Sequence, residues 1–467
     1  MEQQTTMFGK HSLRNTTSRS ILTIAIALVA CAAAADDAPS YAIVVSQATP
    51  DAEAWQKVVA ALEEKHAARG TATLTYRDDV AEALPKLRAW RPRYTCFVAR
   101  PEEATRRFVA QVHELTRQYD ADPYTDTLWG ILTGYDAANA LAIAEHAEPL
   151  VVRRVAAGTQ LAMDMVEEGV WYCELVKNKM VRKERGGKPK TLAGPDDTTR
   201  ALAETLTDYR ADLFVTSGHA TERDWQIGFR YRNGQFRSKA GQLYGVTSTG
   251  ERFPIHSDHP RVYLAVGNCL MGHIDGPDAM AMAWLRSAGV RQMVGYTVPT
   301  WFGYAGWGCL DYFVEQPGRY SLVEAFFANQ HALVYSLERG LGNERGLQFD
   351  KNVVAFYGDP GWEARMANGP RAFELAFSVE GDLHTLTITP NRGEESFAPV
   401  CTNGSQRGGR PFVSMLPERI DAGGVEILDG ADLEPVVADD FLLVPNPGRC
   451  DPSRTYRVVF RAKAARP

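Results

Sequence analysis

The sequence predicts an α/β fold with a mostly parallel sheet and helices on both faces, followed by a small all-β sandwich. Two observations lead to this prediction. Between residues 41 and 119, short β-branched runs alternate with amphipathic helical stretches, which is the pattern of βαβ units. After Pro370 the helical period disappears, and short alternating strands with turn-rich gaps take its place.

The elements follow in a regular order. Strands are expected at 41–46, 71–76 and 94–99, and helices at 52–69, 80–90 and 103–119. Further strands are expected at 151–156, 213–217, 262–267 and 292–296, with helices at 137–146, 199–209 and 278–288. Residues 177–190, rich in Lys, Arg and Gly, are expected to form an exposed loop. The C-terminal strands are expected within 373–389 and at 425–428, 441–444 and 456–460.

The length of 467 residues exceeds one ordinary core, so more than one domain is expected. We predict a signal segment over 1–38 and an α/β domain over 39–370, with sub-halves of roughly 39–150 and 151–370. A β-sandwich domain is predicted over 371–467. The apolar content of 45% and charged content of 23% are typical of a soluble globular protein.

The N-terminal segment has the pattern of a secretory signal. Lys10, Arg14 and Arg19 precede the apolar run 21–30, which is too short to span a bilayer, and small residues follow it. Leu28-Val-Ala-Cys31 also resembles a bacterial lipobox, in which Cys31 would carry a lipid anchor; simple cleavage within 32–35 is the alternative. The chain is therefore expected to be exported by a bacterium, and to be secreted, periplasmic or lipid-anchored.

The charge pattern excludes one class of partner. The net charge is −6, without blocks of like charge, so there is no basic surface for nucleic acid. No further stretch reaches transmembrane length, and the sequence does not specify an oligomeric state.

The most informative motif is Gly267-Asn-Cys269-Leu-Met-Gly272, directly after the predicted strand 262–267. His219 stands in the same kind of position, in Ser217-Gly-His219 after the strand 213–217. In parallel sheets, reactive groups gather at the carboxyl ends of the strands. A thiol and an imidazole at one sheet edge are the minimum set for nucleophilic acyl transfer.

Five segments together resemble the gingipain-type cysteine peptidases, which have the caspase-haemoglobinase fold. They are the opening strand–helix–strand from 41 to 76, Asp126-Thr-Leu-Trp-Gly-Ile-Leu-Thr-Gly134, Ser217-Gly-His-Ala-Thr-Glu222 with Trp225, Asn268-Cys-Leu-Met-Gly272, and Tyr357-Gly-Asp-Pro360. The resemblance covers about 41–362. The immunoglobulin-like domain of that family fits the segment from Arg371 onward.

The resemblance implies a cysteine endopeptidase that needs no cofactor and acts on proteins or peptides. Cys269 would be the nucleophile and His219 the general acid and base, and the backbone N–H groups of Cys269 and Ala220 would hold the oxyanion. The family usually has Gly after the His; Ala220 keeps the N–H but restricts the backbone. No acidic residue is assigned to orient His219, although Glu222 is near in sequence.

The substrate cleft is less sharply predicted. The aromatic stretch that contains Trp301 follows a strand expected beside that of Cys269, and Asn268 adjoins the thiol, so both are cleft candidates. Asp164 is the candidate for an acidic group that would favour Arg or Lys before the cleaved bond.

Three alternatives stay open. The chain could be a catalytically silent peptidase-like surface binding protein, or a metal-dependent hydrolase using His256, His259 and His273. Cys309 is a weaker rival nucleophile.

The other cysteines are expected to have structural roles. Cys96 and Cys173 are expected to be buried thiols, and in an oxidising compartment Cys401 and Cys450 could form a disulfide.

Overall fold

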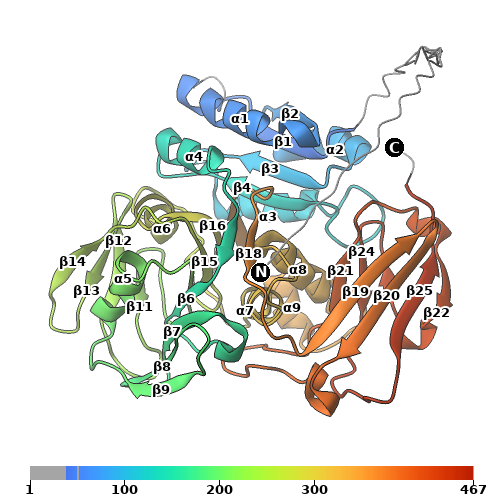
Figure 1. Ribbon diagram of the computed structural model, residues 1–467. Coiled ribbons are helices and arrows are strands. Elements are labelled where there is room, and N and C mark those ends of the chain that lie inside the picture. The colour runs from blue at the N-terminus through green and yellow to red at the C-terminus, as the bar shows by residue number, and fades with distance from the viewer. Residues whose placement is uncertain (1–37, 50–51, 466–467) are drawn as a thin grey trace, which may run out of the picture. The chain divides into compact units, whose positions relative to one another are not determined.

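The computed structural model describes residues 38–49 and 52–465, so the predicted signal segment and Cys31 lie outside the described residues, apart from Ala38. Within these residues the main feature is a twelve-stranded sheet (Figure 1). Its order is β2 (Thr71–Tyr76), β1 (Tyr41–Ser46), β3 (Tyr94–Val98), β4 (Leu128–Leu132), β17 (Val354–Gly358), β16 (Val290–Tyr296), β15 (Arg261–Ala265), β10 (Leu213–Thr216), β6 (Arg154–Ala157), β7 (Glu168–Tyr172), β8 (Lys179–Lys183) and β9 (Lys190–Ala193).

The sheet consists of two parallel blocks that run in opposite directions. Strands β2, β1, β3, β4 and β17 are parallel to one another, and so are β16, β15, β10, β6 and β7. The blocks meet at the antiparallel pair β16–β17. Strands β8 and β9 extend the second block as an antiparallel hairpin.

Helices pack on both faces of this sheet. Trp284 of α6 (Met280–Ser287) stacks on Tyr263 of β15 with ring centroids 4.0 Å apart. Tyr296 of β16 points to the opposite face, because side chains alternate along a strand, and its hydroxyl accepts the N–H of Gly306 in α7 (Tyr304–Phe313). On the first block, α1 (Glu53–His66) contacts β1 and β2, and α8 (Leu322–Glu338) contacts β4.

The C-terminal part is all-β. One antiparallel sheet has the order β19 (Phe373–Glu380), β20 (Leu383–Pro390), β25 (Tyr456–Arg461) and β22 (Glu426–Asp429), and a second has β21 (Phe412–Met415), β24 (Phe441–Val444) and β23 (Val436–Val437). The predicted fold class, a mostly parallel α/β sheet followed by a small all-β sandwich, is confirmed. The domain boundaries at 150 and 370 stay predictions.

Some elements differ from the prediction. Residues 177–190 are not simply a loop, because β8 and the first residue of β9 lie in this range and form an edge hairpin on β7. The small sheet of β11 (Asp224–Gln226), β12 (Gln235–Lys239), β13 (Gln242–Val246) and β14 (Arg252–Ile255) was not predicted, nor were α7, α8 and α9 (Glu344–Asp350). Helix α8 begins with a capping box of Ser321 and Glu324, a local signal that the sequence does contain.

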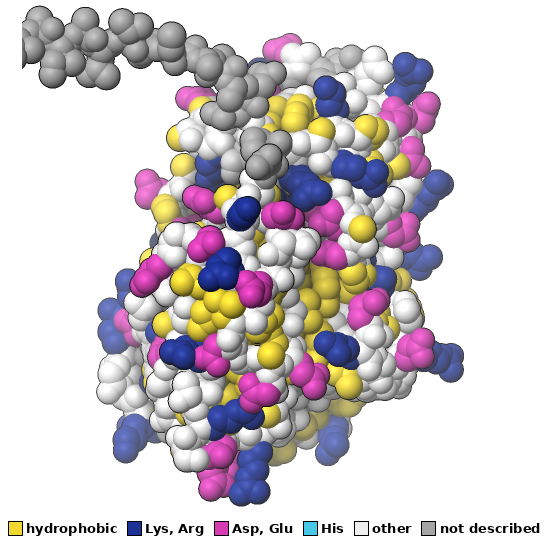
Figure 2. All heavy atoms as spheres, turned by 90° about the vertical axis from the view of Figure 1, so that its right-hand side faces the viewer, with side chains coloured by type: hydrophobic (Ala, Val, Ile, Leu, Met, Phe, Trp, Pro, Cys, Tyr) yellow, Lys and Arg dark blue, Asp and Glu magenta, His cyan; other side chains and the backbone are white. Residues whose placement is uncertain are grey.

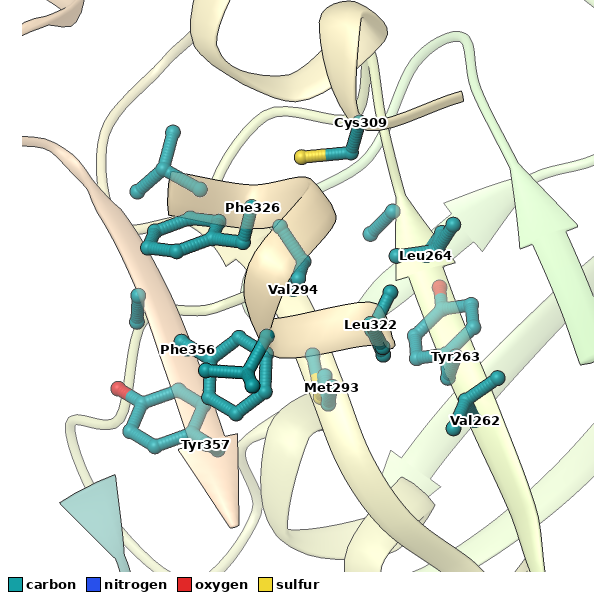
Figure 3. Packing of buried hydrophobic residues seen from close by; sticks show 14 of the residues in the cluster. Val262, Tyr263, Leu264, Met293, Val294, Cys309, Leu322, Phe326, Phe356 and Tyr357 are labelled. Atoms are coloured by element: carbon teal, nitrogen blue, oxygen red, sulfur yellow. The ribbon is translucent and has the colours of Figure 1, made fainter. Parts of the chain in front are cut away.

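Three of the cysteines are buried in the main hydrophobic core. Cys309 is fully buried in α7, in the same hydrophobic cluster as Leu264, Val294 and Phe326 (Figure 3). Because its side chain is 0% exposed, a substrate cannot reach the thiol, and burial also raises the pKa of this thiol to about 12; both argue against Cys309 as a nucleophile. Cys96 and Cys173 are buried, as predicted.

The predicted pairing of Cys401 and Cys450 is wrong for this structure, in which both are free thiols. Cys401 packs with Ala162, Met165 and Ala372, whereas Cys450 belongs to the core of the C-terminal strands. The two residues thus lie in different hydrophobic clusters, which their closeness in sequence does not reveal.

The charged surface is mixed on the face that Figure 2 shows, where Lys and Arg side chains are interspersed with Asp and Glu. Among the described residues, no helix is long and apolar enough to cross a membrane.

Candidate active site

Five strand ends meet at one edge of the second block. Strands β6, β7, β10, β15 and β16 are parallel neighbours, so the residues that follow them lie at the same edge. Those residues are Gly158-Thr159 after β6, Cys173-Glu174 after β7, Ser217-Gly218-His219 after β10, Asn268-Cys269 after β15 and Thr297–Thr300 after β16. The structure thus places Cys269 and His219 on neighbouring strand ends.

Cys269 is half-buried, and its thiol faces the segment that follows β16. The N–H of Thr300 donates to Sγ at 3.2 Å, and Sγ donates to the carbonyl of Thr300 at 3.6 Å. The next residue, Leu270, has φ 58°, a left-handed conformation that costs energy for a non-glycine residue. The thiol therefore lies at a constrained turn, beside a backbone donor that would stabilise a thiolate.

His219 is exposed at the neighbouring strand end. The preceding Gly218 has φ 90°, which a residue with a Cβ rarely adopts, so this turn requires glycine. The imidazole stacks on Phe229 with ring centroids 4.8 Å apart. In the described part of the chain, its polar atoms make no hydrogen bond to Cys269, whose sulfur contacts Thr300 instead.

Asn268 joins the two loops. Its side chain is fully buried; its Oδ1 accepts from Thr216 Oγ1 at 2.6 Å, and its Nδ2 donates to the carbonyl of Gly218 at 3.0 Å. The residue before the thiol is thus bonded to the residue before the imidazole. Asn268 is predicted from the sequence as a cleft residue, but the structure buries its side chain between the two loops.

The backbone N–H groups of Cys269 and Ala220 have no acceptor within the described residues. In the turn that contains Ala220, the N–H of Thr221 donates to Asp224 and that of Gln226 to His219, so the bridge between Ala220 and Trp225 leaves the Ala220 N–H unused. Both donors are available for a developing negative charge.

Glu174 is a residue of this edge that sequence reasoning missed. Its carboxylate is buried and accepts from Thr159 Oγ1 at 2.8 Å and from the hydroxyl of Ser217. Burial raises the pKa of Glu174, while hydrogen bonds from Ser217, Thr159 and Asn403 act in the opposite direction. The β-type run 169–172 ends at Cys173-Glu174, and the same strand-end reasoning would have found it. Glu222, the acidic residue near His219 in sequence, makes no side-chain hydrogen bond within the described residues.

The two remaining cleft candidates lie apart. Trp301 is 51% exposed and follows Thr300, so the structure brings it to the thiol edge. Asp164 lies at the amino end of β7, because Lys183, which pairs with Gly169 there, donates to the carbonyl of Asp164 at 3.2 Å. It is therefore at the opposite end of the strand from Glu174 and away from Cys269.

The three histidines of the metal-site alternative are also separated. His259 lies before β15 and its Nε2 contacts Asp212, directly before β10, at 2.8 Å. His256 contacts Asp258, whereas His273 follows Cys269 at the other edge. A shared metal is excluded because a strand length separates them.

Within the described residues, the carboxylates of Asp120, Asp122 and Asp126 are the only group of three or more candidate ligands brought within 4.8 Å of one another. They lie on the loop before β4, in the first block of the sheet. Acidic groups of this kind are common without an ion.

Comparisons with known proteins give the following. No protein-family model and no curated protein matches the sequence. Solved structures that resemble the chain include a complex of the Porphyromonas gingivalis RgpB pro- and mature domains, with 10% identity over 87% of this chain and 93% of that chain and a TM-score of 0.43. Another is described as a protease, with 9% identity over 91% and 95% of the two chains and a TM-score of 0.42. Sequence identities and TM-scores this low do not indicate a function.

Proposed function

We propose that this chain is an exported cysteine endopeptidase that hydrolyses peptide bonds through Cys269 and His219. The observation that carries the proposal is the Asn268 bridge. It ties the strand end bearing the thiol to the strand end bearing the imidazole. The gingipain-like motifs at the same two positions support it independently.

The proposed chemistry proceeds in two balanced steps. The Cys269 thiolate attacks the peptide carbonyl carbon, the C–N bond breaks, and the His219 imidazolium gives its proton to the departing amine. Water then attacks the thioester while His219 takes its proton, and the C–S bond breaks to restore the thiolate. The N–H groups of Cys269 and Ala220 would hold the oxyanion in both steps, each donor contributing ~3 kcal/mol.

Glu174 would be the acidic partner of His219 in this mechanism. Gly218 lies against it: a Cβ at Gly218 would be 3.9 Å from Glu174 Oε2. A buried carboxylate at this position would fix the loop that carries the imidazole. Its contact with the histidine loop goes through Ser217 rather than to the ring itself.

The second candidate is a peptidase-like binding protein without activity. The observation that favours it is the arrangement of His219, which stacks on Phe229, while the thiol hydrogen-bonds to Thr300. A peptidase would need the imidazole to reach the thiol when substrate binds.

Replacement of the nucleophile tests the proposal. Cys269→Ala should abolish cleavage of a peptide library by the purified mature protein and leave its melting midpoint within about 3 °C, because a strand-end thiol makes few core contacts. Iodoacetamide should inactivate the wild type and a chelator should not. Cleavage by the alanine variant at the wild-type rate would end the cysteine-peptidase proposal.

Export and the domain roles remain proposals as well. We propose a bacterial exported protein with a lipid anchor at Cys31 or simple signal cleavage, distinguished by the mass of the mature N-terminal peptide. The segment 371–467 is proposed to be immunoglobulin-like.

A further inference from the structure

One segment of the C-terminal β region lies against the candidate active site. We name residues 401–410, between the 3₁₀ turn Gly393–Phe397 and β21, the strap. Gly404 of the strap packs on the ring of Trp307, where a Cβ would come within 2.5 Å, and Asn403 Nδ2 donates to Thr159 Oγ1 at 3.0 Å. Thr159 follows β6, so the strap reaches the same sheet edge as Cys269 and His219.

A buried ion pair holds the strap in place. The Arg407 side chain is 1% exposed; its Nε contacts Asp311 at 2.7 Å and its guanidinium also pairs with Glu315. The N–H of Gly408 donates to Asp311 at 2.9 Å. Breaking such a pair would leave an uncompensated buried charge, which favours this position of the strap.

The hydrogen bonds of Asn403 lead to the histidine loop. Thr159 Oγ1, which accepts from Asn403, donates to Glu174 Oε1 at 2.8 Å, and the other carboxylate oxygen accepts from Ser217. Ser217 lies two residues before His219. The Asn403 amide thus faces the buried carboxylate with its N–H groups, while its Oδ1 has no partner among the described residues.

Glu174 depends on these donors for its charge. No Lys or Arg pairs with it in the described part of the chain; the groups around its carboxylate are the hydroxyls of Ser217 and Thr159, the Asn403 amide and the nearby phenol of Tyr231. Burial favours the protonated form of this carboxyl, and the donated hydrogen bonds act in the opposite direction. Removing one donor favours its protonated form, and a neutral carboxyl accepts the hydrogen bond of Ser217 more weakly, so the turn that carries His219 is held less firmly.

We propose that Asn403 is a positioning residue of the active site, which holds Glu174 and Thr159 beneath the His219 loop. The C-terminal β region then supplies part of the catalytic apparatus and is more than an appended domain. This inference rests on the proposed cysteine-peptidase function.

The experiment uses the full mature chain with Asn403→Ala, Asn403→Ser and the control Asn391→Ala, an exposed asparagine of the same region. Two pH profiles are measured: kcat/KM on the best library peptide, and the rate of Cys269 alkylation by iodoacetamide. We expect Asn403→Ala to lower kcat about tenfold, the loss of one hydrogen bond to a charged group, with KM within about twofold of wild type. The pH range of rapid alkylation should narrow, Asn403→Ser should recover part of it, and Asn391→Ala should match wild type.

Profiles of Asn403→Ala that superimpose on the wild type would overturn the inference. If that variant fails to fold, Asn403→Ser is judged by the same criterion. If the wild type is alkylated at Cys269 but cleaves no peptide, the proposed function fails while the alkylation profiles still decide the role of Asn403.

Discussion

The Asn268 bridge allows the sharpest test of the site, because one substitution removes the bonds that join the two loops. Asn268→Ala removes the acceptor of the buried Thr216 hydroxyl and the donor to the part-buried Gly218 carbonyl. The Thr216 hydroxyl keeps its hydrogen bond to Tyr263, whereas the Gly218 carbonyl loses its partner, so the free energy of unfolding should fall by about 1–3 kcal/mol. This is less than the total stability of ordinary proteins, so the variant should fold.

The activity of Asn268→Ala should fall by more than the loss of folded protein explains. Without the bridge, the Cys269 and His219 loops are no longer held to each other, and a displacement of ~1 Å at reacting groups costs about 100-fold in rate. Urea denaturation gives the stability, and kcat/KM and the alkylation rate of Cys269 give the functional loss, all measured where the variant is folded.

Thr216→Val is the matched control. It removes the hydroxyl that bonds Asn268 and Tyr263 but keeps the Asn268–Gly218 bond, so it should lose similar stability and less than about tenfold activity. Equal losses of activity in the two variants would show that the bridge does not align the pair.

Two further predictions concern the oxyanion and acid stability. Ala220→Pro should fold and lose about 10²–10³ in kcat because it lacks the N–H, whereas Ala220→Gly should keep or raise activity; a fully active proline variant would remove position 220 from the oxyanion hole. Asp359 is buried, which favours its protonated form, yet hydrogen bonds from His66 and Lys65 hold its pKa far below the usual range. Its stabilising contribution is therefore complete above about pH 4, the value in an unfolded chain, and is lost as the pH falls towards its folded pKa. Asp359→Asn should lower the free energy of unfolding at pH 7 by about 3–5 kcal/mol and flatten its decline below pH 4, measured by urea denaturation; an unchanged acid dependence would refute this role.

The sequence predicts the strand ends because they depend on short-range signals. The β-branched runs before Cys269 and His219 and the glycines around them are local features, and the structure has strands where they predict them. Asp164 was predicted at the substrate cleft but lies at the amino end of β7. A residue in a connecting segment can lie at either end of a strand, and only the path of the chain decides which. His256 and His259 were grouped with His273 for the same reason.

Long-range partners are what the sequence could not supply. Asn403 and Thr159 are 244 positions apart, and nothing in either local stretch indicates that they meet. Cys401 and Cys450 illustrate the converse, since two residues close in sequence lie in different hydrophobic clusters. Contacts of this kind are set by how the C-terminal strands pack on α7 and the main sheet.

The polar side chains of the site join neighbouring strand ends one after another. Asn268 joins the ends of β15 and β10, Glu174 joins those of β7 and β10, and Thr159 adds β6, to which Asn403 connects the strap. This network ends at the loop that carries His219, which it reaches through Ser217 and the Gly218 carbonyl. Substitutions within the network should therefore lower activity more than stability, because a buried network fixes the positions of the groups that it joins. Substitution of Asp359 should instead lower stability more than activity, because its partners Tyr41, Lys65 and His66 belong to the first half of the chain.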